Sequence, residues 1–431
     1  MQNQLISPTP EHAPQLQRLA GEVRKQPSLG ALFLAILTGF ALVSAPSAQS
    51  QTFTTLYSFS GENDGWNPIA PVLYINGNLY GTTEYGNSDS LCKFGNAPSN
   101  GCGTVYEISS IGSETLLHVF TGSPDGQYPS SGLIQDSAGN FYGTTLAGGT
   151  SGNSGFDGYG TVYKIDVGGN ESVLHSFTST PDGDTPVGNL IIDAAGNLYG
   201  ATYTGGANRL GSVFKVNSKG NETLLHSFAG APTDGQIPWS GLVMDGKGNL
   251  YGTTKYGGDA PNSGGTVFKV DKKGQETVLY NFTGEGDGHM PMSTLALDAK
   301  GNLYGTTYSG GFFASGQCAV GCGTVFRIDA TGKFTVLHRF KGGSDGGNPA
   351  AGLLRSADGK FLYGTTASYN DTTYAGTVFQ VGTGGETVLY GFPASGVDGT
   401  VPLAGLVQDA AGNLYGTTSA GSFGSVFKLT P

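Results

Sequence analysis

The amino-acid sequence predicts an all-β protein, a seven-bladed β-propeller whose blades are four-stranded antiparallel sheets. Three observations lead to this prediction. The element Tyr-Gly-Thr-Thr, once Tyr-Gly-Ala-Thr, occurs seven times, with its glycine at Gly81, Gly143, Gly200, Gly252, Gly305, Gly364 and Gly416. The element Asp-Gly-x-x-Pro also occurs seven times, first at Asp64 and last at Pro402. Glycine supplies 74 of the 431 residues without a collagen period, which is typical of tight turns between short strands.

Each repeat is expected to contain four short strands. The first resembles Ser131–Gln135, the second Leu198–Thr202, the third Gly265–Val270 and the fourth Glu222–Phe228. An Asp-x-x-Gly-Asn turn separates the first two strands, and another glycine-containing turn separates the last two. Repetition of such a unit at intervals of 52 to 62 residues favours radial packing, which buries each sheet between its neighbours and leaves only short edges.

The two ends of the propeller sequence predict how the ring closes. Residues 53–59 read as a lone fourth strand, whereas the last repeat stops after a third strand, at residues 424–429. We therefore expect the N-terminal strand to complete the last blade as its outer strand.

Loop lengths indicate one functional face. Between the second and third strands the loops vary from 5 to 19 residues, whereas the rest of each unit keeps 43 or 44 residues. Antiparallel succession puts these loops on the same face as the loops between the fourth and first strands. Insertions concentrated on one face of a repeat protein often mark a binding face.

Residues 1–50 differ from the rest and are interpreted as a leader with a secretory signal peptide, before a propeller over residues 51–431. Arg24 and Lys25 precede an apolar run from Leu29 to Ala45 and a small-residue stretch. An uncleaved anchor is the alternative, although the run is shorter than the usual span of about 20 residues. We expect a monomer that is secreted, periplasmic or at the cell surface. The net charge of −11 disfavours a nucleic-acid partner.

The repeat unit GTVFKVD…ETLLHSF…DG..P..GL..D..GNLYGTT..GG resembles the GloVer (Gloeo/Verruco-type) tandem repeat over residues 52–430. This family is found in exported bacterial proteins that commonly carry interchangeable C-terminal anchors. The resemblance implies export and a β-propeller, and it brings no catalytic residues. Here the chain ends at Pro431 without an apolar tail, so tethering by such an anchor is not expected.

Four cysteines lie in the long loops. Cys92 and Cys102 bracket nine residues, and Cys318 and Cys322 bracket three. In an exported protein, two local disulfides are expected. A four-thiolate zinc site is the alternative, but it would require loops from two distant blades to meet.

The histidines and loop carboxylates give no clear catalytic pattern. His118, His175, His226 and His338 share a repeat position with Tyr57, Tyr280 and Tyr390, which indicates packing with a polar tip. His289 could act as a general base, but no nucleophile pattern accompanies it. Loop carboxylates could form a glycosidase pair; the candidates are Glu84, Asp89, Asp157, Asp184, Asp259 and Glu285. We predict no cofactor and no metal site, since no loop carries a known calcium pattern.

Aromatic side chains in the variable loops suggest binding. Flat rings with polar tips suit sugar rings or a protein partner, with packing between loops as the alternative. The predicted binding residues on this face are Trp66, Tyr85, Tyr128, Asp184, Tyr203, Trp239, Tyr256, His289 and Tyr308. Our leading hypothesis is therefore an exported, non-catalytic binding or scaffold propeller for polysaccharide or protein. The alternative is a carbohydrate-active hydrolase or lyase that uses acidic loop residues.

The repeated aspartate of Asp-Gly-x-x-Pro is interpreted as a local turn-forming residue rather than a ligand. Ligand specificity is then expected in the two variable letters of each element. These are Trp66-Asn67, Gln127-Tyr128, Asp184-Thr185, Gln236-Ile237, His289-Met290, Gly347-Asn348 and Thr400-Val401.

Overall fold

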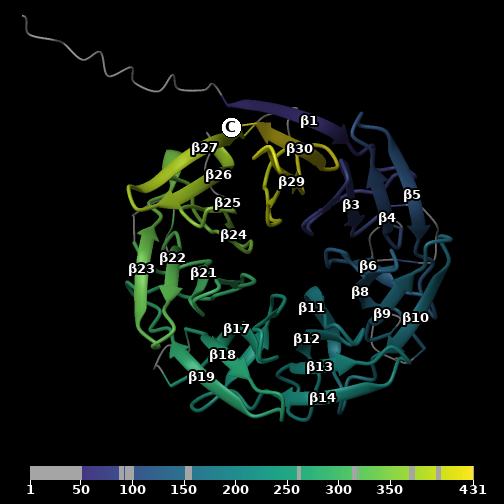
Figure 1. The fold of residues 1–431 in the computed structure, drawn as a ribbon, viewed down its shortest axis with the longest axis horizontal. Helices are drawn as coiled ribbons and strands as arrows, with labels where there is room; N and C mark the ends of the chain where they lie inside the picture. The colour runs from purple at the N-terminus through teal and green to yellow at the C-terminus, as the bar shows by residue number, and fades with distance from the viewer. Residues whose placement is uncertain are drawn as a thin grey trace, which may run out of the picture. The chain divides into compact units, whose positions relative to one another are not determined.

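The computed structural model describes residues 51–430, except 87–91, 93–100, 151–157, 260–263, 313–317, 319, 368–373 and 395–398. The predicted leader, Asp89 and Asp157 therefore lie outside the described residues. Seven separate antiparallel sheets stand around a ring (Figure 1). This arrangement confirms the predicted seven-bladed propeller.

Blades are numbered here in chain order, each from its inner to its outer strand. Blade 1 contains β2 (Leu73–Ile75), β3 (Asn78–Thr83), β4 (Thr104–Ile108) and β5 (Glu114–Val119). Blade 2 contains β6 (Gln127–Pro129), β7 (Ile134–Gln135), β8 (Phe141–Ala147), β9 (Thr161–Ile165) and β10 (Glu171–Ser176). Blade 3 contains β11 (Asp184–Ile192), β12 (Leu198–Thr204), β13 (Ser212–Val216) and β14 (Glu222–Ser227).

The remaining blades follow the same order. Blade 4 contains β15 (Gly235–Pro238), β16 (Val243–Met244), β17 (Leu250–Gly257), β18 (Thr266–Val270) and β19 (Glu276–Asn281). Blade 5 contains β20 (Ala296–Leu297), β21 (Leu303–Thr307), β22 (Thr324–Ile328) and β23 (Phe334–Arg339). Blade 6 contains β24 (Leu354–Arg355), β25 (Leu362–Thr366), β26 (Tyr374–Gly382) and β27 (Gly385–Pro393). Blade 7 contains β28 (Val407–Gln408), β29 (Leu414–Thr418), β30 (Ser425–Thr430) and β1 (Thr52–Ser58).

The inner strands differ from the prediction of one strand per blade over positions such as Ser131–Gln135. In blade 2 the inner edge is divided between β6 and β7, which pair separately with β8. Between them the hydroxyl of Ser131 accepts a hydrogen bond from the Thr144 amide at 2.9 Å. A side chain thus takes the place of a ladder bond to β8, and four inner-strand residues lie between paired positions that are separated by only two residues in β8.

Ring closure occurs as predicted. Strand β1 pairs antiparallel with β30, from Thr52 opposite Thr430 to Ser58 opposite Ser425. The first and last strands of the propeller thereby share one sheet at the edge of the ring (Figure 1). Neither disulfide of the described residues joins β1 to blade 7, so strand pairing and packing of β1 hold the ring closed.

The second variable letter of each Asp-Gly-x-x-Pro element links neighbouring blades. Its φ is positive in all seven copies, and its N–H donates to a carbonyl just before or at the start of the third strand of the preceding blade. For example, Ile237 N lies 2.8 Å from Leu210 O, and Asn67 N lies 3.0 Å from Phe423 O across the closure. The left-handed backbone is costly for a branched residue such as Ile237. Its recurrence indicates a structural role for this position.

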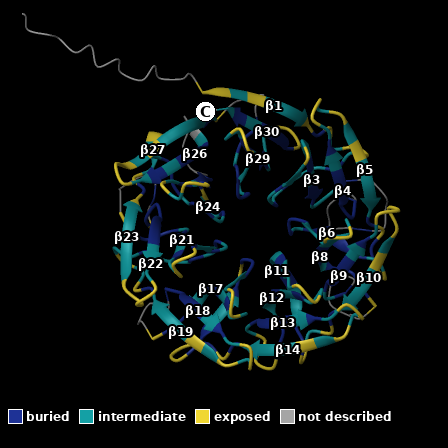
Figure 2. Cartoon of the chain, in the orientation of Figure 1, coloured by how far each residue is buried: buried dark blue, intermediate teal, exposed yellow. Residues whose placement is uncertain are grey.

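The core lies in the middle strands. Buried residues follow the second and third strands of each blade, whereas exposed residues gather on the outer strands and turns (Figure 2). The glycine of Tyr-Gly-Thr-Thr is needed here, because a Cβ at Gly200 would lie 2.5 Å from Cζ of Phe214. In the described part of the chain the only helix is the three-residue 3₁₀ turn Gly343–Asp345, and no helix has the length and apolarity to cross a membrane.

Candidate functional site: the central cavity

A cavity of about 660 Å³ lies at the centre of the ring and receives residues from all seven blades. Two register positions supply most of its wall. The first is the residue after the proline of Asp-Gly-x-x-Pro: Ile69, Ser130, Val187, Trp239, Met292, Ala350 and Leu403. The second is the residue after Thr-Thr in the second strand: Glu84, Leu146, Tyr203, Lys255 and Tyr308. Because both segments end at the same face, their variable residues converge on the axis.

Aromatic rings form one side of the cavity. The rings of Tyr203 and Trp239 meet edge to face with centroids 5.1 Å apart. The Lys255 ammonium lies 5.1 Å from the centroid of Trp239, within cation–π range. Trp239 is still 43% exposed, although it is a large apolar side chain. An exposed, braced indole in a concave site is available for a flat apolar surface of a ligand.

Glu84 is the one acidic side chain among the described residues that line the cavity. Its Oε2 accepts a hydrogen bond from Asn67 Nδ2 at 2.6 Å. Burial raises the pKa of this carboxyl above its usual value, and hydrogen bonds from Tyr85 and Asn67 oppose the rise. A carboxyl held in this way can accept or donate a hydrogen bond to a ligand hydroxyl.

The structure brings three of the predicted binding residues to the cavity, namely Tyr203, Trp239 and Tyr308. Trp66, Tyr85 and Tyr128 instead pack on one another. The Trp66 and Tyr85 centroids are 4.5 Å apart, those of Tyr85 and Tyr128 are 5.5 Å apart, and Tyr128 is only 2% exposed. Tyr85 is the second residue after Thr-Thr, so strand alternation points it away from the residue that reaches the axis.

The other predicted residues lie beside the cavity wall. Asp184 accepts a hydrogen bond from the Thr185 hydroxyl at 2.8 Å, and burial raises its pKa. His289 Nδ1 lies 3.1 Å from Ser309 Oγ, and burial, with the nearby Lys255 charge, lowers its pKa. The ring of Tyr256 lies 6.4 Å from that of His289. Among the variable letters of Asp-Gly-x-x-Pro, only Thr185 and Met290 line the cavity.

Sequence reasoning missed Lys255, Leu146 and Met292 as cavity residues. The signal was available in the sequence, because each residue stands at a fixed offset from an invariant proline or Thr-Thr. The sequence did not show which way each side chain points, because this depends on where the inner strand is irregular.

The repeated aspartates lie at the rim of the propeller and make local bonds. Asp234 accepts hydrogen bonds from the backbone N–H groups of Ala229 at 2.7 Å and Gly235 at 2.6 Å. His226 Nε2 lies 3.0 Å from the same carboxylate. Equivalent histidines or tyrosines contact Asp64, Asp125, Asp182, Asp287 and Asp345. The histidine position therefore packs with its polar tip on an aspartate.

Both predicted disulfides are confirmed. Cys92 pairs with Cys102, and Cys318 pairs with Cys322, with Cα atoms 5.2 Å and 5.1 Å apart. All four cysteines are buried. The disulfides thus form part of the packed base of the two longest loops.

Comparison with protein families decides the family of the chain. The model of the Gloeobacter/Verrucomicrobia repeat matches residues 92–319 and 313–431. The chain belongs to this family. The family is the one that the sequence resemblance indicated, and the matched residues include all of blades 2 to 6. A comparison with curated protein sequences found no match.

Solved structures similar to this Gloeobacter/Verrucomicrobia repeat protein share its fold at low sequence identity. The Niastella koreensis GH74 enzyme aligns with a TM-score of 0.56 at 16% identity, over 88% of this chain and 53% of that one. Oligogalacturonate lyase from Vibrio parahaemolyticus aligns with a TM-score of 0.51 at 11% identity, over 89% and 94%. An extracellular domain assigned to a hybrid two-component system of B. thetaiotaomicron aligns with a TM-score of 0.53 at 13% identity, over 88% and 41%. The chain thus spans about two fifths of that domain's length and half of the GH74 enzyme.

Proposed function

We propose that this propeller is an exported binding module that holds a saccharide in its central cavity without cleaving it. The observation that carries the proposal is the exposed Trp239 indole, braced by Tyr203 and Lys255 in a cavity that Tyr308 also lines. Sugar rings present a flat apolar face and a rim of hydroxyls. Aromatic rings bind the face, and Glu84, Lys255 and the tyrosine hydroxyl groups can bond the hydroxyls.

Three further observations support the proposal. Two of the solved structures with a similar fold are named as a GH74 enzyme and an oligogalacturonate lyase. The two buried disulfides suit an oxidising compartment outside the cytoplasm, as does the fold shared with an extracellular domain. Hydrolysis by the usual mechanism needs two carboxyl groups roughly 5 to 9.5 Å apart. Glu84 has no carboxylate companion among the described residues of the cavity wall.

The alternative is a hydrolase or lyase, and the raised pKa of Glu84 favours it specifically. Burial raises the pKa of this carboxyl, and a carboxyl with a raised pKa holds its proton more readily, as a general acid must. Its partner would then have to come from the ligand or from the loops outside the described residues.

One experiment distinguishes saccharide binding from saccharide cleavage. The protein, expressed with its own N-terminal segment, is applied to a glycan array and to insoluble polysaccharides, and each supernatant is analysed for released oligosaccharides. We expect retention by a saccharide without release, and its loss in Trp239→Ala. Release that disappears in Glu84→Gln would establish the enzyme instead. Absence of retention, with capture of a purified protein partner through the same face, would overturn saccharide binding.

A further inference from the structure

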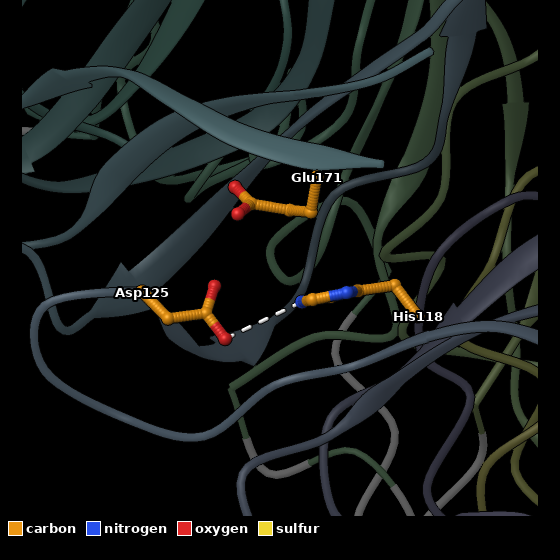
Figure 3. A group of neighbouring side chains, drawn as sticks. All are labelled: His118, Asp125 and Glu171. Carbon is orange, nitrogen blue, oxygen red and sulfur yellow. Dashed lines mark hydrogen bonds and ion pairs between the residues drawn. The ribbon is translucent and has the colours of Figure 1, made fainter. Parts of the chain in front are cut away.

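The outer strands run head to tail around the rim, so the end of one lies near the start of the next (Figure 1). We call each such junction a seam and name it by its two blades. At seam 1/2, His118 comes from the end of β5, Asp125 from the following loop and Glu171 from the first position of β10. The three side chains point toward one another (Figure 3).

The geometry of seam 1/2 leaves two carboxylate oxygens unused. One ligand atom from each of the three residues lies within 4.8 Å of the other two. His118 Nε2 is 3.3 Å from Asp125 Oδ2, which also accepts the Thr121 N–H at 2.9 Å. Asp125 Oδ1 and Glu171 Oε1 are buried, and neither has a hydrogen-bond partner within the described part of the chain. Two carboxyl oxygens buried side by side without donors are costly unless something positive lies between them.

Other seams use the same position differently. Seams 2/3 and 3/4 have the same three residue types, but there the second aspartate oxygen is occupied. Asp182 Oδ1 accepts the Thr178 hydroxyl at 2.7 Å, and Asp234 Oδ1 accepts the Gly235 N–H at 2.6 Å. At seam 4/5 a phenylalanine replaces the glutamate, and Phe334 stacks on Tyr280 with centroids 3.9 Å apart. At this seam the Asp287 carboxylate accepts hydrogen bonds from Tyr280 and Thr283, and a phenylalanine ring takes the place of the second carboxyl.

A disulfide supports the loop that carries Asp125. A Cβ placed at Gly122 would lie 3.2 Å from Cys92 Sγ and 3.8 Å from Cys102 Sγ. The other seam with clustered ligand atoms, formed by His338, Asp345 and Glu386, also follows a disulfide-bearing blade. There Asp345 contacts His338 through both oxygens, at 3.3 Å each. Seam 1/2 is thus the one at which a braced loop leaves both carboxylates with an unused oxygen.

We propose that His118, Asp125 and Glu171 bind one divalent transition-metal ion, with Zn²⁺ as the matching ion, which joins the outer strands of blades 1 and 2. One imidazole nitrogen and two carboxylate oxygens form a donor set suited to zinc. The two carboxylates balance the double positive charge.

Zinc ligands lie about 2.0 to 2.2 Å from the metal, so the separations between the three ligand atoms would have to shorten by roughly 1 Å. Rotation of the Glu171 side chain can provide this movement. The side chains of His118 and Asp125 are 19% and 14% exposed, so solvent has access to a fourth position. The sequence alone predicted no metal site, because the three residues come from two repeats.

The test compares zinc binding by the full chain and by a variant that copies an existing seam. The double variant His118→Tyr with Glu171→Phe turns seam 1/2 into the Tyr–Phe arrangement of seam 4/5, which favours folding. Metal-stripped protein is titrated with ZnCl₂ by calorimetry, and bound zinc is counted by mass spectrometry after desalting. We expect the variant to bind one zinc ion fewer than the wild type and to lose the zinc-dependent rise in melting temperature.

A matched control makes the same exchange at seam 2/3, His175→Tyr with Glu222→Phe. This variant is expected to keep the wild-type zinc count, because Asp182 has no unused oxygen. Circular dichroism of each variant establishes that the propeller is folded, and Glu171→Ala provides a second test if the double variant is not. The proposal is overturned if wild type and the seam 1/2 variants bind equal amounts of zinc. It is also overturned if Ca²⁺ stabilises the protein as well as Zn²⁺ does, since His118 would then not be a ligand.

Discussion

Trp239 and Tyr203 come from neighbouring blades, and their rings meet edge to face 5.1 Å apart in the wall of the central cavity. The contact fixes the indole without burying it, which keeps an apolar surface ready for a ligand. If a saccharide stacks there, Trp239→Ala should weaken its binding about tenfold to a hundredfold, as loss of a stacked aromatic contact does. Calorimetric titration with the best saccharide from the array measures this change.

Phe312→Ala is the matched control for Trp239→Ala. Phe312 is also aromatic and 47% exposed, and it follows the second strand of blade 5, but it does not line the cavity. Its removal should leave the dissociation constant unchanged. Equal losses in both variants would mean that a broad patch on the loop face, and not the cavity, holds the ligand.

Asp234 connects a loop to an outer strand through three hydrogen bonds to its carboxylate. Asp234→Ala should lower the free energy of unfolding by about 3 kcal/mol, since it leaves the Ala229 N–H and the buried Gly235 N–H without their acceptor. Asp234→Asn should cost less because an acceptor oxygen remains. Urea denaturation followed by tryptophan fluorescence measures both. A comparable loss in Asp259→Ala, at an exposed loop carboxylate, would argue against this explanation.

The sequence was sufficient for the blade count and for ring closure, because both follow from repeats of fixed spacing and from an unpaired strand at each end. Disulfide pairing was predictable for a similar reason, since each pair is local in sequence. These features depend on distances along the chain. They require no knowledge of how a strand bends.

The cavity and the seams depend on the directions of side chains and outer strands, which the repeats alone do not show. Trp239 directly follows its proline and lines the cavity, whereas Tyr128 precedes its proline with a positive φ and is buried, so the irregular inner strand decides which residues face the axis. The group of His118 and Glu171 forms because outer strands run along the circumference and bring residues of two repeats together. The repeated aspartates lie beside the ends of these outer strands, where they bond the histidines.

Glu222 makes stability dependent on pH. Burial raises its pKa from 4.5 to about 7, with the nearby His175 charge lowering it and the Asp182 charge raising it. The folded chain therefore keeps a proton on Glu222 over an interval in which the unfolded chain has lost it. The free energy of unfolding should be greatest near pH 4.5, fall as the pH rises toward 7 and level off above that.

Burial is also the main cause that raises the pKa of Glu276 to about 7. Glu276 should therefore steepen the fall of the free energy of unfolding with rising pH. Urea midpoints between pH 4.5 and 8 measure the dependence. Glu222→Gln is expected to flatten the curve in part and Glu222→Gln with Glu276→Gln to flatten it further. Asp182, whose pKa is lowered, titrates below this interval. A midpoint that increases with pH, or a slope that neither variant changes, would contradict the assignment.

Phe53 holds the strand that closes the ring. Its ring stacks on Tyr390 of blade 6 with centroids 4.2 Å apart and contacts Phe427 of blade 7 at 5.4 Å. Phe53→Ala should lower the free energy of unfolding by about 2 to 3 kcal/mol, less than for a fully buried phenylalanine because Phe53 remains partly accessible. Because β1 is attached to blade 7 by non-covalent contacts, the loss should appear first as release of this strand from that blade. Limited proteolysis should then cut near residues 52–60 before the rest of the chain. Thr54→Ala, at an exposed position of the same strand, should change neither the free energy of unfolding nor the site of first cleavage. If the two variants were equally sensitive, the Phe53 ring would not be what holds the closing strand.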